Sequence, residues 1–282
     1  MDQTPQYRKR GYLKEDFRLF HLRDVGVEEM EHHYHEFDKI VIFLSGTADY
    51  IIEGRSYFLQ PWDVLLVSHH LIHKPVIDPN DPYERVVIYL DPAFVQSSST
   101  AGEDLTSCFR LARERQFALM RPTSGQRALL EGLVAELEQA LADRAFGSDL
   151  LRRTCFLRLM IHLNRAMVRD RTDRNESASR YDPKIARMLS YINEHLTDEL
   201  TVDQLARLAY TSKYHFMRRF KQVTGCSVHR YVTQKRLLAA ADLLRSGSGA
   251  QAACAQCGFQ DYSAFQRAFC RQFGVTPSRF AP

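Results

Sequence analysis

An internal repeat in the last third of the chain constrains the fold more than any other feature. The segment TSKYHFMRRFKQVTGCSVHRY, residues 211–231, matches QDYSAFQRAFCRQFGVTPSRF, residues 260–280, at a constant offset. The matched pairs include two phenylalanines and a glycine: Phe216 with Phe265, Phe220 with Phe269, and Gly225 with Gly274. Before each segment, a short run with small residues at matching positions predicts another helix. Each unit is therefore predicted to form a helix, a turn and a second helix.

The first unit has the residue types of a DNA-reading helix. Ser212 is a suitable N-cap, and Phe216 and Phe220 lie one turn apart on the face that we expect to be buried. The outward and flanking positions carry cations, an aromatic residue and a methionine: Lys213, Tyr214, Met217, Arg218 and Lys221. Arginine, lysine and aromatic side chains on such a helix are typical of contacts with a DNA groove.

One long helix is predicted between the two units, over residues 228–245, with Ser227 as its cap and Gly247 just beyond its end. At 1.5 Å per residue its length is about 27 Å, comparable to the roughly 34 Å of one DNA turn. Charge supports a nucleic-acid partner, because residues 183–282 contain 14 Lys and Arg against 6 Asp and Glu, a balance of +8. The rest of the chain has a balance of −4.

This C-terminal region, residues 182–280, resembles the AraC-type transcription regulators. The resemblance rests on LARLAYTSKYHFMRRFKQVTG and on the Gly-Phe-x-Asp-x-Ser-x-Phe-x-Arg-x-Phe run from Gly258 to Phe269, followed by Gly274 and Thr276-Pro277. It implies base contacts at two sets of positions: Tyr214, Met217 and Arg218 in the first unit, and Tyr262, Ser263, Gln266 and Arg267 in the second. The sequence departs from the family at Ala250, Ala253 and Cys257, where larger aliphatics are usual, so we expect looser packing there.

The N-terminal part is predicted to form a β-barrel. Short runs rich in Val, Ile and Tyr, such as KIVIFLSG, ADYIIEG, DVLLVS and RVVIYLD, are separated by Gly, Pro and Asp. Residues 20–95 resemble the cupin-type sensor domain of the same regulators, through HYHEFDKIVIFLSG and LQPWDVLLVSHHLIH. The expected fold is therefore α+β with two domains: a cupin-like barrel followed by helices, and an all-α double helix-turn-helix.

Four regions follow from these patterns. Residues 1–122 form the predicted effector-binding domain, 123–169 two amphipathic helices suited to dimerisation, 170–181 a polar linker, and 182–282 the DNA-binding domain. The last domain is expected to begin at Asp182, a helix cap followed by Pro183 at the first helical position.

The histidines of HHYHEFDK are the candidate ligand site. Metal-binding cupins have a His-x-His pair, a Glu four residues later and a His from a later strand; the matching positions here are His33, His35, Lys39 and His73. Residues 33, 35 and 39 would share one face of a continuous strand. A protonated lysine repels a divalent ion, so we predict no metal and an effector site for a sugar or a carboxylate. The alternative is that these residues bind no ligand and only pair with one another.

The pair Cys254 and Cys257 has the spacing of a redox or zinc motif. No second pair follows at ligand spacing, and the repeat places both cysteines on the buried face of a helix. We therefore interpret them as small core residues.

Composition supports a cytoplasmic protein without a membrane span: there is no long apolar run, no N-terminal signal pattern, and six cysteines in 282 residues. We expect a transcription regulator, with activation as the expected mode, that binds double-stranded DNA, a small-molecule effector and RNA polymerase as a homodimer. No cofactor and no catalytic residue are predicted. Two alternatives stay open: a metal-dependent cupin enzyme fused to a DNA-binding domain, and a regulator whose N-terminal domain only dimerises.

Overall fold

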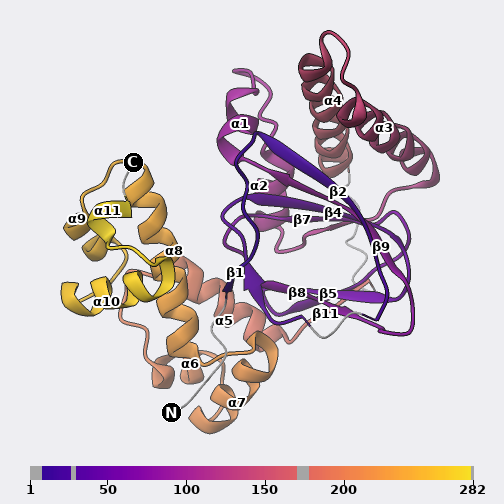
Figure 1. Ribbon diagram of the computed structural model, residues 1–282. Coiled ribbons are helices and arrows are strands. Elements are labelled where there is room, and N and C mark those ends of the chain that lie inside the picture. Colours follow the sequence, from indigo (N-terminus) through magenta and orange to yellow (C-terminus); the bar gives the residue numbers. More distant parts are fainter. Residues whose placement is uncertain (1–7, 27–29, 170–177, 281–282) are drawn as a thin grey trace. The chain divides into compact units, whose positions relative to one another are not determined.

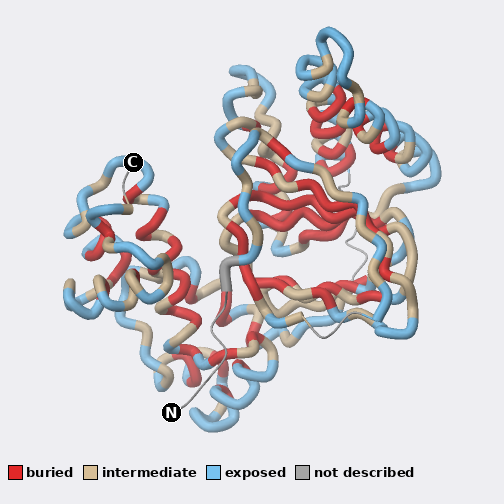
Figure 2. Tube along the Cα trace, viewed as in Figure 1, coloured by how far each residue is buried: buried red, intermediate tan, exposed pale blue. Residues whose placement is uncertain are grey.

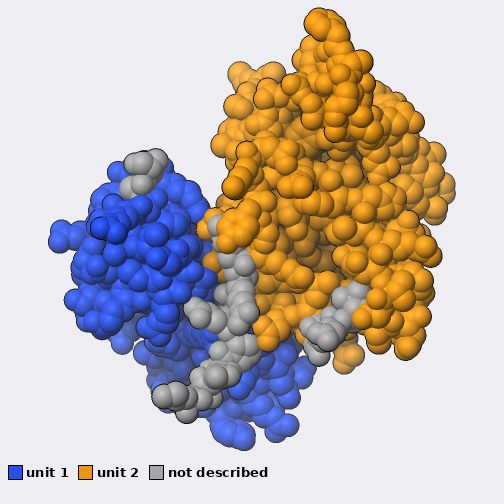
Figure 3. Space-filling model, viewed as in Figure 1, with its two compact units in different colours: residues 1–7, 53–55, 181–282 blue, residues 8–52, 56–180 orange. Residues whose placement is uncertain are grey.

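The computed structural model describes residues 8–26, 30–169 and 178–280. The chain divides into two compact units (Figure 3): residues 8–52 and 56–180 form the barrel unit, and residues 181–280 with 53–55 form the helical unit. The predicted class, α+β with two domains, is confirmed.

Two sheets face each other in the barrel unit (Figure 1). One has the order β1-β3-β8-β5-β6-β11 and the other β10-β7-β4-β9-β2. The strands are β1 Arg8–Lys9, β2 Phe17–Asp24, β3 His33–Tyr34, β4 Asp38–Ser45, β5 Ala48–Ile52, β6 Arg55–Phe58, β7 Val64–Val67, β8 His73–Ile77, β9 Tyr83–Leu90, β10 Leu119–Met120 and β11 Ser179–Arg180. All four strand-like runs of the sequence form strands, namely β4, β5, β7 and β9.

Successive side chains of β4 point to opposite faces of the sheet and therefore pack into two different hydrophobic cores. Ile40 and Ile42 pack with the helices that cover the outer face of the second sheet. Val41 points to the opposite side, into the space between the sheets, where it joins Tyr50 of β5 and Val87 of β9. Lys39 has the parity of Val41, so its side chain enters the same interior. Consecutive residues of β4 are buried from Asp38 to Phe43, and Figure 2 shows the tube of the central strands coloured mostly as buried.

The described part of the barrel unit contains four helices: α1 Pro92–Ser97, α2 Ser107–Glu114, α3 Ser124–Ala142 and α4 Ser148–Arg169. The two helices predicted within residues 123–169 are confirmed as α3 and α4, and Thr123 forms a capping box with Gln126 at the start of α3. Leu129 of α3 and Leu151 of α4 are about half exposed. Of the predicted linker, residues 170–177 lie outside the described residues, and Ser179–Arg180 pairs with β6.

The helical unit contains seven helices within its described residues: α5 Pro183–Glu194, α6 Val202–Leu208, α7 Lys213–Thr224, α8 Val228–Arg245, α9 Ala250–Gln256, α10 Tyr262–Phe273 and α11 Pro277–Phe280. Asp182 caps α5 by accepting from the amides of Lys184 and Ile185, as predicted.

The predicted repeat is visible in the backbone itself. Gly225 ends α7 with φ 79° and Gly274 ends α10 with φ 77°, a left-handed conformation that favours glycine. Ser212 and Asp261, which also correspond, accept hydrogen bonds at the starts of the same helices. The connecting helix α8 has the predicted bounds, although Ser227 makes no side-chain cap.

Within residues 8–26, 30–169 and 178–280, none of the helices combines the length and hydrophobicity that a bilayer crossing requires.

Candidate functional site

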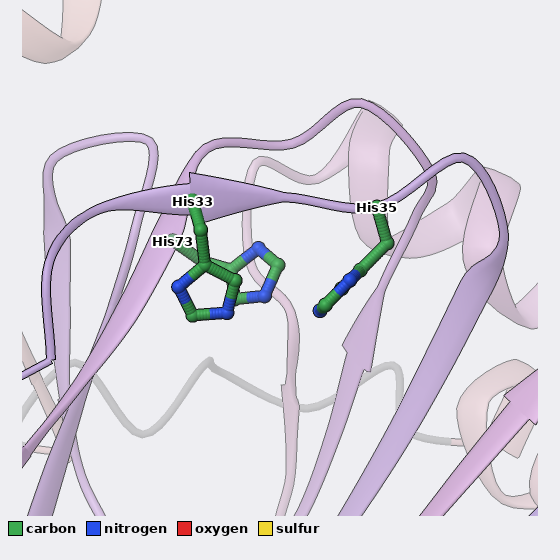
Figure 4. A group of neighbouring side chains, drawn as sticks. All are labelled: His33, His35 and His73. Carbon is green, nitrogen blue, oxygen red and sulfur yellow. The ribbon is translucent and has the colours of Figure 1, made fainter. Parts of the chain in front are cut away.

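Three histidines converge in the interior of the barrel unit (Figure 4). The rings of His33 and His73 lie 4.5 Å apart between centroids, and the ring of His35 lies 5.1 and 4.9 Å from these two. The strand predicted through residues 33–39 is not continuous, because the chain bends between β3 and β4. Instead His33 pairs directly with His73 across β3 and β8, and this pairing brings the early and late histidines together.

Each imidazole is held by a backbone carbonyl. The Nδ1 of His33 donates to the carbonyl of Glu31 at 3.0 Å, the Nδ1 of His73 to that of Leu71 at 2.8 Å, and the Nδ1 of His35 to that of Arg10. A carbonyl oxygen only accepts, so Nδ1 carries the proton in all three rings. Every Nε2 therefore presents a lone pair to the shared space.

Lys39 supplies a hydrogen-bond donor to these acceptors. Its Nζ lies 3.5 Å from Nε2 of His35, 3.5 Å from Nε2 of His73, and donates to the hydroxyl of Tyr50 at 2.9 Å. Its side chain reaches this point from β4, where Lys39 pairs with Val67 and Tyr89. Lys39 and the three histidines are all buried.

Burial lowers the pKa values of Lys39 and of the three histidines. Desolvation and the charge of Lys39 lower the pKa of His33 to about 3 and that of His35 to about 2, and the same causes lower the pKa of His73 well below its usual value. Desolvation, with the charges of Arg85 and Arg10, lowers the pKa of Lys39 to about 7. The histidines are therefore neutral acceptors at physiological pH.

The arrangement can bind a polar molecule through one donor and several acceptors in an otherwise apolar interior. The structure brings together all four residues that the sequence singled out. It adds Tyr50, Arg10 and Arg85, which the sequence reasoning missed. Tyr50 and Arg10 contact the cluster directly, while Arg85 is buried in the same interior and pairs with Asp24 at 2.6 Å. Their positions depend on pairing between distant strands, which has no local pattern.

In the helical unit, α7 is anchored by two buried phenylalanines and exposes its polar face. Phe216 and Phe220 are buried, as predicted. Tyr214 is 74% exposed and Met217 is 40% exposed, and the remaining predicted residues of this helix are exposed as well: Lys213, Arg218 and Lys221. An exposed helix face with these residue types is the arrangement that enters a DNA major groove.

The second unit presents a less exposed surface. In α10, Ser263 and Arg267 are exposed, whereas Tyr262 and Gln266 are only partly so, and Tyr262 packs against the core around Phe265. Cys254 and Cys257 belong to that core, and burial raises the pKa of both thiols, to about 11 for Cys257. Both are therefore protonated core residues, as expected from the repeat.

Two features near α7 were not predicted. Tyr210, in the turn before this helix, has φ 51° and is 81% exposed. A bulky residue rarely adopts this backbone conformation, which makes Tyr210 a candidate contact residue beside Tyr214. Lys213 bonds Asp203 of α6 at 2.8 Å, so part of its charge is directed along the protein surface.

Comparisons with known proteins give the same two parts. Residues 24–154 match the AraC-like ligand binding domain, and residues 205–281 match a helix-turn-helix domain. The HTH-type transcriptional activator RhaS of Escherichia coli (strain SE11) is 26% identical over 246 residues, covering 87% of this chain and 85% of RhaS.

Two solved structures are similar in part or along most of the chain. The DNA-binding domain of AdpA, solved in complex with a target DNA, is 32% identical and covers 35% of this chain and 89% of its own, with a TM-score of 0.34. ToxT from Vibrio cholerae is 15% identical and covers 94% of this chain and 98% of its own, also with a TM-score of 0.34. Because its sequence matches both an AraC-like ligand binding domain and the helix-turn-helix domain that follows, the chain belongs to the AraC-type family of DNA-binding transcription regulators.

Proposed function

We propose that this regulator is a transcription activator controlled by a small molecule that contacts His33, His35, Lys39 and His73. The observation that carries the proposal is the buried cluster itself, inside the region that matches an AraC-like ligand binding domain. Burying polar groups costs free energy unless they are well paired, and the contacts of Lys39 to His35 and His73 are long, at 3.5 Å. A ligand hydroxyl could replace them with shorter bonds by accepting from Lys39 and donating to an Nε2, whereas a carboxylate would accept from Lys39 alone.

DNA recognition is assigned to the exposed faces of α7 and α10. The residues proposed to contact the duplex are Lys213, Tyr214, Met217, Arg218, Lys221, Tyr262, Ser263, Gln266 and Arg267. Arg218 is proposed to read a base edge, most simply guanine, and Lys221, one turn further, to contact phosphate.

Dimerisation is assigned to residues 123–169. The helices α3 and α4 leave Leu129, Leu150 and Leu151 exposed, in addition to the faces that they bury. A homodimer would read two DNA sites, and a bound effector would change DNA occupancy or contact with RNA polymerase. Such a protein acts where the chromosome is, in the bacterial cytoplasm, and needs no catalytic residue.

A thermal-shift screen of sugars and carboxylates against the full chain tests the effector site. A true effector should raise the unfolding temperature in a concentration-dependent way and change DNA affinity. Lys39→Met keeps most of the stem but removes the charge, and should weaken effector binding roughly tenfold to a hundredfold, as expected for the loss of one charge-assisted hydrogen bond.

Lys74→Met is the matched control. Lys74 neighbours His73 on β8, so its side chain alternates to the other face of the strand. Effector binding should be unchanged in this variant. Equal effector binding by wild type and Lys39→Met would place the effector elsewhere. A regulator whose N-terminal domain only dimerises would show no stabilising compound at all, and a metal-dependent cupin enzyme would be purified with about one equivalent of metal.

A further inference from the structure

The three histidines have the donor set of a metal site, yet a lysine side chain stands among them. Their coordinating nitrogens lie within 4.8 Å of one another. Three neutral imidazoles are a common protein ligand set for zinc. In such sites each imidazole usually donates its second N–H to a carbonyl or carboxylate, which fixes the ring and directs the free nitrogen at the metal. Here the carbonyls of Glu31, Arg10 and Leu71 serve in that way.

The position that a metal ion would need is taken by Lys39. Its Nζ lies 3.5 Å from two of the three Nε2 atoms, on the side where their lone pairs point. Tyr50 fixes the ammonium from a third direction at 2.9 Å. A divalent ion coordinated by the histidines would lie within a few ångströms of this ammonium, where like charges repel strongly because water is excluded. The four residues together therefore do not fit a bound metal.

We infer that the three histidines form a preformed metal site and that the side chain of Lys39 occupies it and excludes metal ions. Removing this one side chain should therefore produce a zinc site. In this role Lys39 is the residue that determines specificity: with it the site takes a polar organic ligand, and without it a transition-metal ion. The inference concerns the residues of the proposed effector site but requires neither an effector nor DNA.

Cobalt titration of the full chain tests this directly, because tetrahedral Co²⁺ absorbs visible light and substitutes for Zn²⁺. The Lys39→Ala protein should bind one equivalent of Co²⁺ with tetrahedral bands, and one equivalent of Zn²⁺ by elemental analysis after dialysis. Wild-type protein should bind at this site at least about a hundredfold more weakly, because the ion must both displace the buried Lys39 side chain and bind where an ammonium charge is otherwise held.

The double variant Lys39→Ala/His73→Ala is the control for the six cysteines, which remain in every protein compared. It should lose the tetrahedral cobalt signal that Lys39→Ala gains. Lys39→Glu is a second variant in case Lys39→Ala does not fold, because a carboxylate can complete the ligand set; it should also bind one equivalent.

Three results would overturn the inference. One is stoichiometric metal at the histidines of the wild type. Another is a cobalt signal of Lys39→Ala that survives the loss of His73. The third is a folded Lys39→Ala or Lys39→Glu protein that binds no metal. The second and third results bear neither on DNA binding nor on effector stabilisation, so failure of the inference is distinguishable from failure of the proposed function. Metal in the wild type would count against both.

Discussion

The two units of this chain place positive charge in opposite environments. The barrel unit buries the ammonium of Lys39 among three neutral imidazoles, whereas the helical unit exposes Arg218, Lys221 and Arg267 on helices held by buried phenylalanines. A buried charge is costly, sensitive to pH and selective for its partner. Exposed charges cost little and act over a distance that salt screens. The difference suits a ligand site in one unit and a DNA-binding surface in the other.

The largest effect on stability is expected from a substitution in the buried core that anchors α7. Phe220 is fully buried and contacts the rings of Phe216 and Tyr231. Phe220→Ala should lower the free energy of unfolding of the helical unit by about 3–5 kcal/mol and abolish DNA binding without touching a DNA contact. Chemical denaturation monitored by circular dichroism would measure this. A loss below about 1 kcal/mol would show that α7 does not depend on this core.

A smaller effect is expected at the exposed surface itself. Arg218→Ala should cost about 1–3 kcal/mol of binding on a cognate duplex and relax the preference at one base position. Lys221→Ala, the phosphate-type comparison, should weaken all duplexes similarly. Competition binding with a set of single-base variants separates the two. Identical behaviour of both variants would contradict the proposed docking of α7.

The buried charge predicts a pH dependence that the exposed charges do not. Because the pKa of Lys39 is about 7 in the folded protein and 10.5 is its ordinary value, the unfolded chain binds more protons between these limits. The contribution of Lys39 to stability should therefore rise with pH in this window, by at most about 1.4 kcal/mol per pH unit. The lowered pKa values of His33, His35 and His73 act in the same direction at lower pH, so stability should fall as the pH drops below 6.5.

Urea unfolding of wild type and Lys39→Met at several pH values checks this. The difference between the two proteins should change with the predicted slope above pH 7. Parallel profiles would mean that Lys39 is not a buried, titrating group.

The smallest effect is expected from the cysteine pair. Cys254→Ala and Cys257→Ala each remove one buried sulfur and should cost about 1 kcal/mol of stability. Neither should change the metal content or the sensitivity to reductant. A loss of bound zinc on substitution, measured by elemental analysis, would revive the reading of this pair as a metal motif.

The sequence predicted correctly those elements that depend on residues close together in the chain. The bounds of α8 followed from a helical pattern between Ser227 and Gly247, and the repeat located α7 and α10. The strand assumed through His33 and Lys39 was wrong, although the residues do converge. Their convergence depends on β3 pairing with β8, and the contact of Tyr50 depends on β5 pairing with β8. Such partners are distant in sequence, so no local period reveals them. The exposed Tyr210 was missed because its turn conformation is unusual for tyrosine.

The salt dependence of DNA binding tests the central claim most directly. A duplex selected from random sequence by the full chain would be titrated by fluorescence anisotropy at several salt concentrations. The logarithm of the affinity should fall steeply and linearly with the logarithm of salt, because neutralised phosphates release counterions. Lys221→Ala should reduce the slope by about one, whereas Lys39→Met should leave it unchanged, since the charge of Lys39 is buried inside the barrel unit. An affinity independent of salt, or a slope altered by Lys39→Met and not by Lys221→Ala, would contradict the division of roles between the two units.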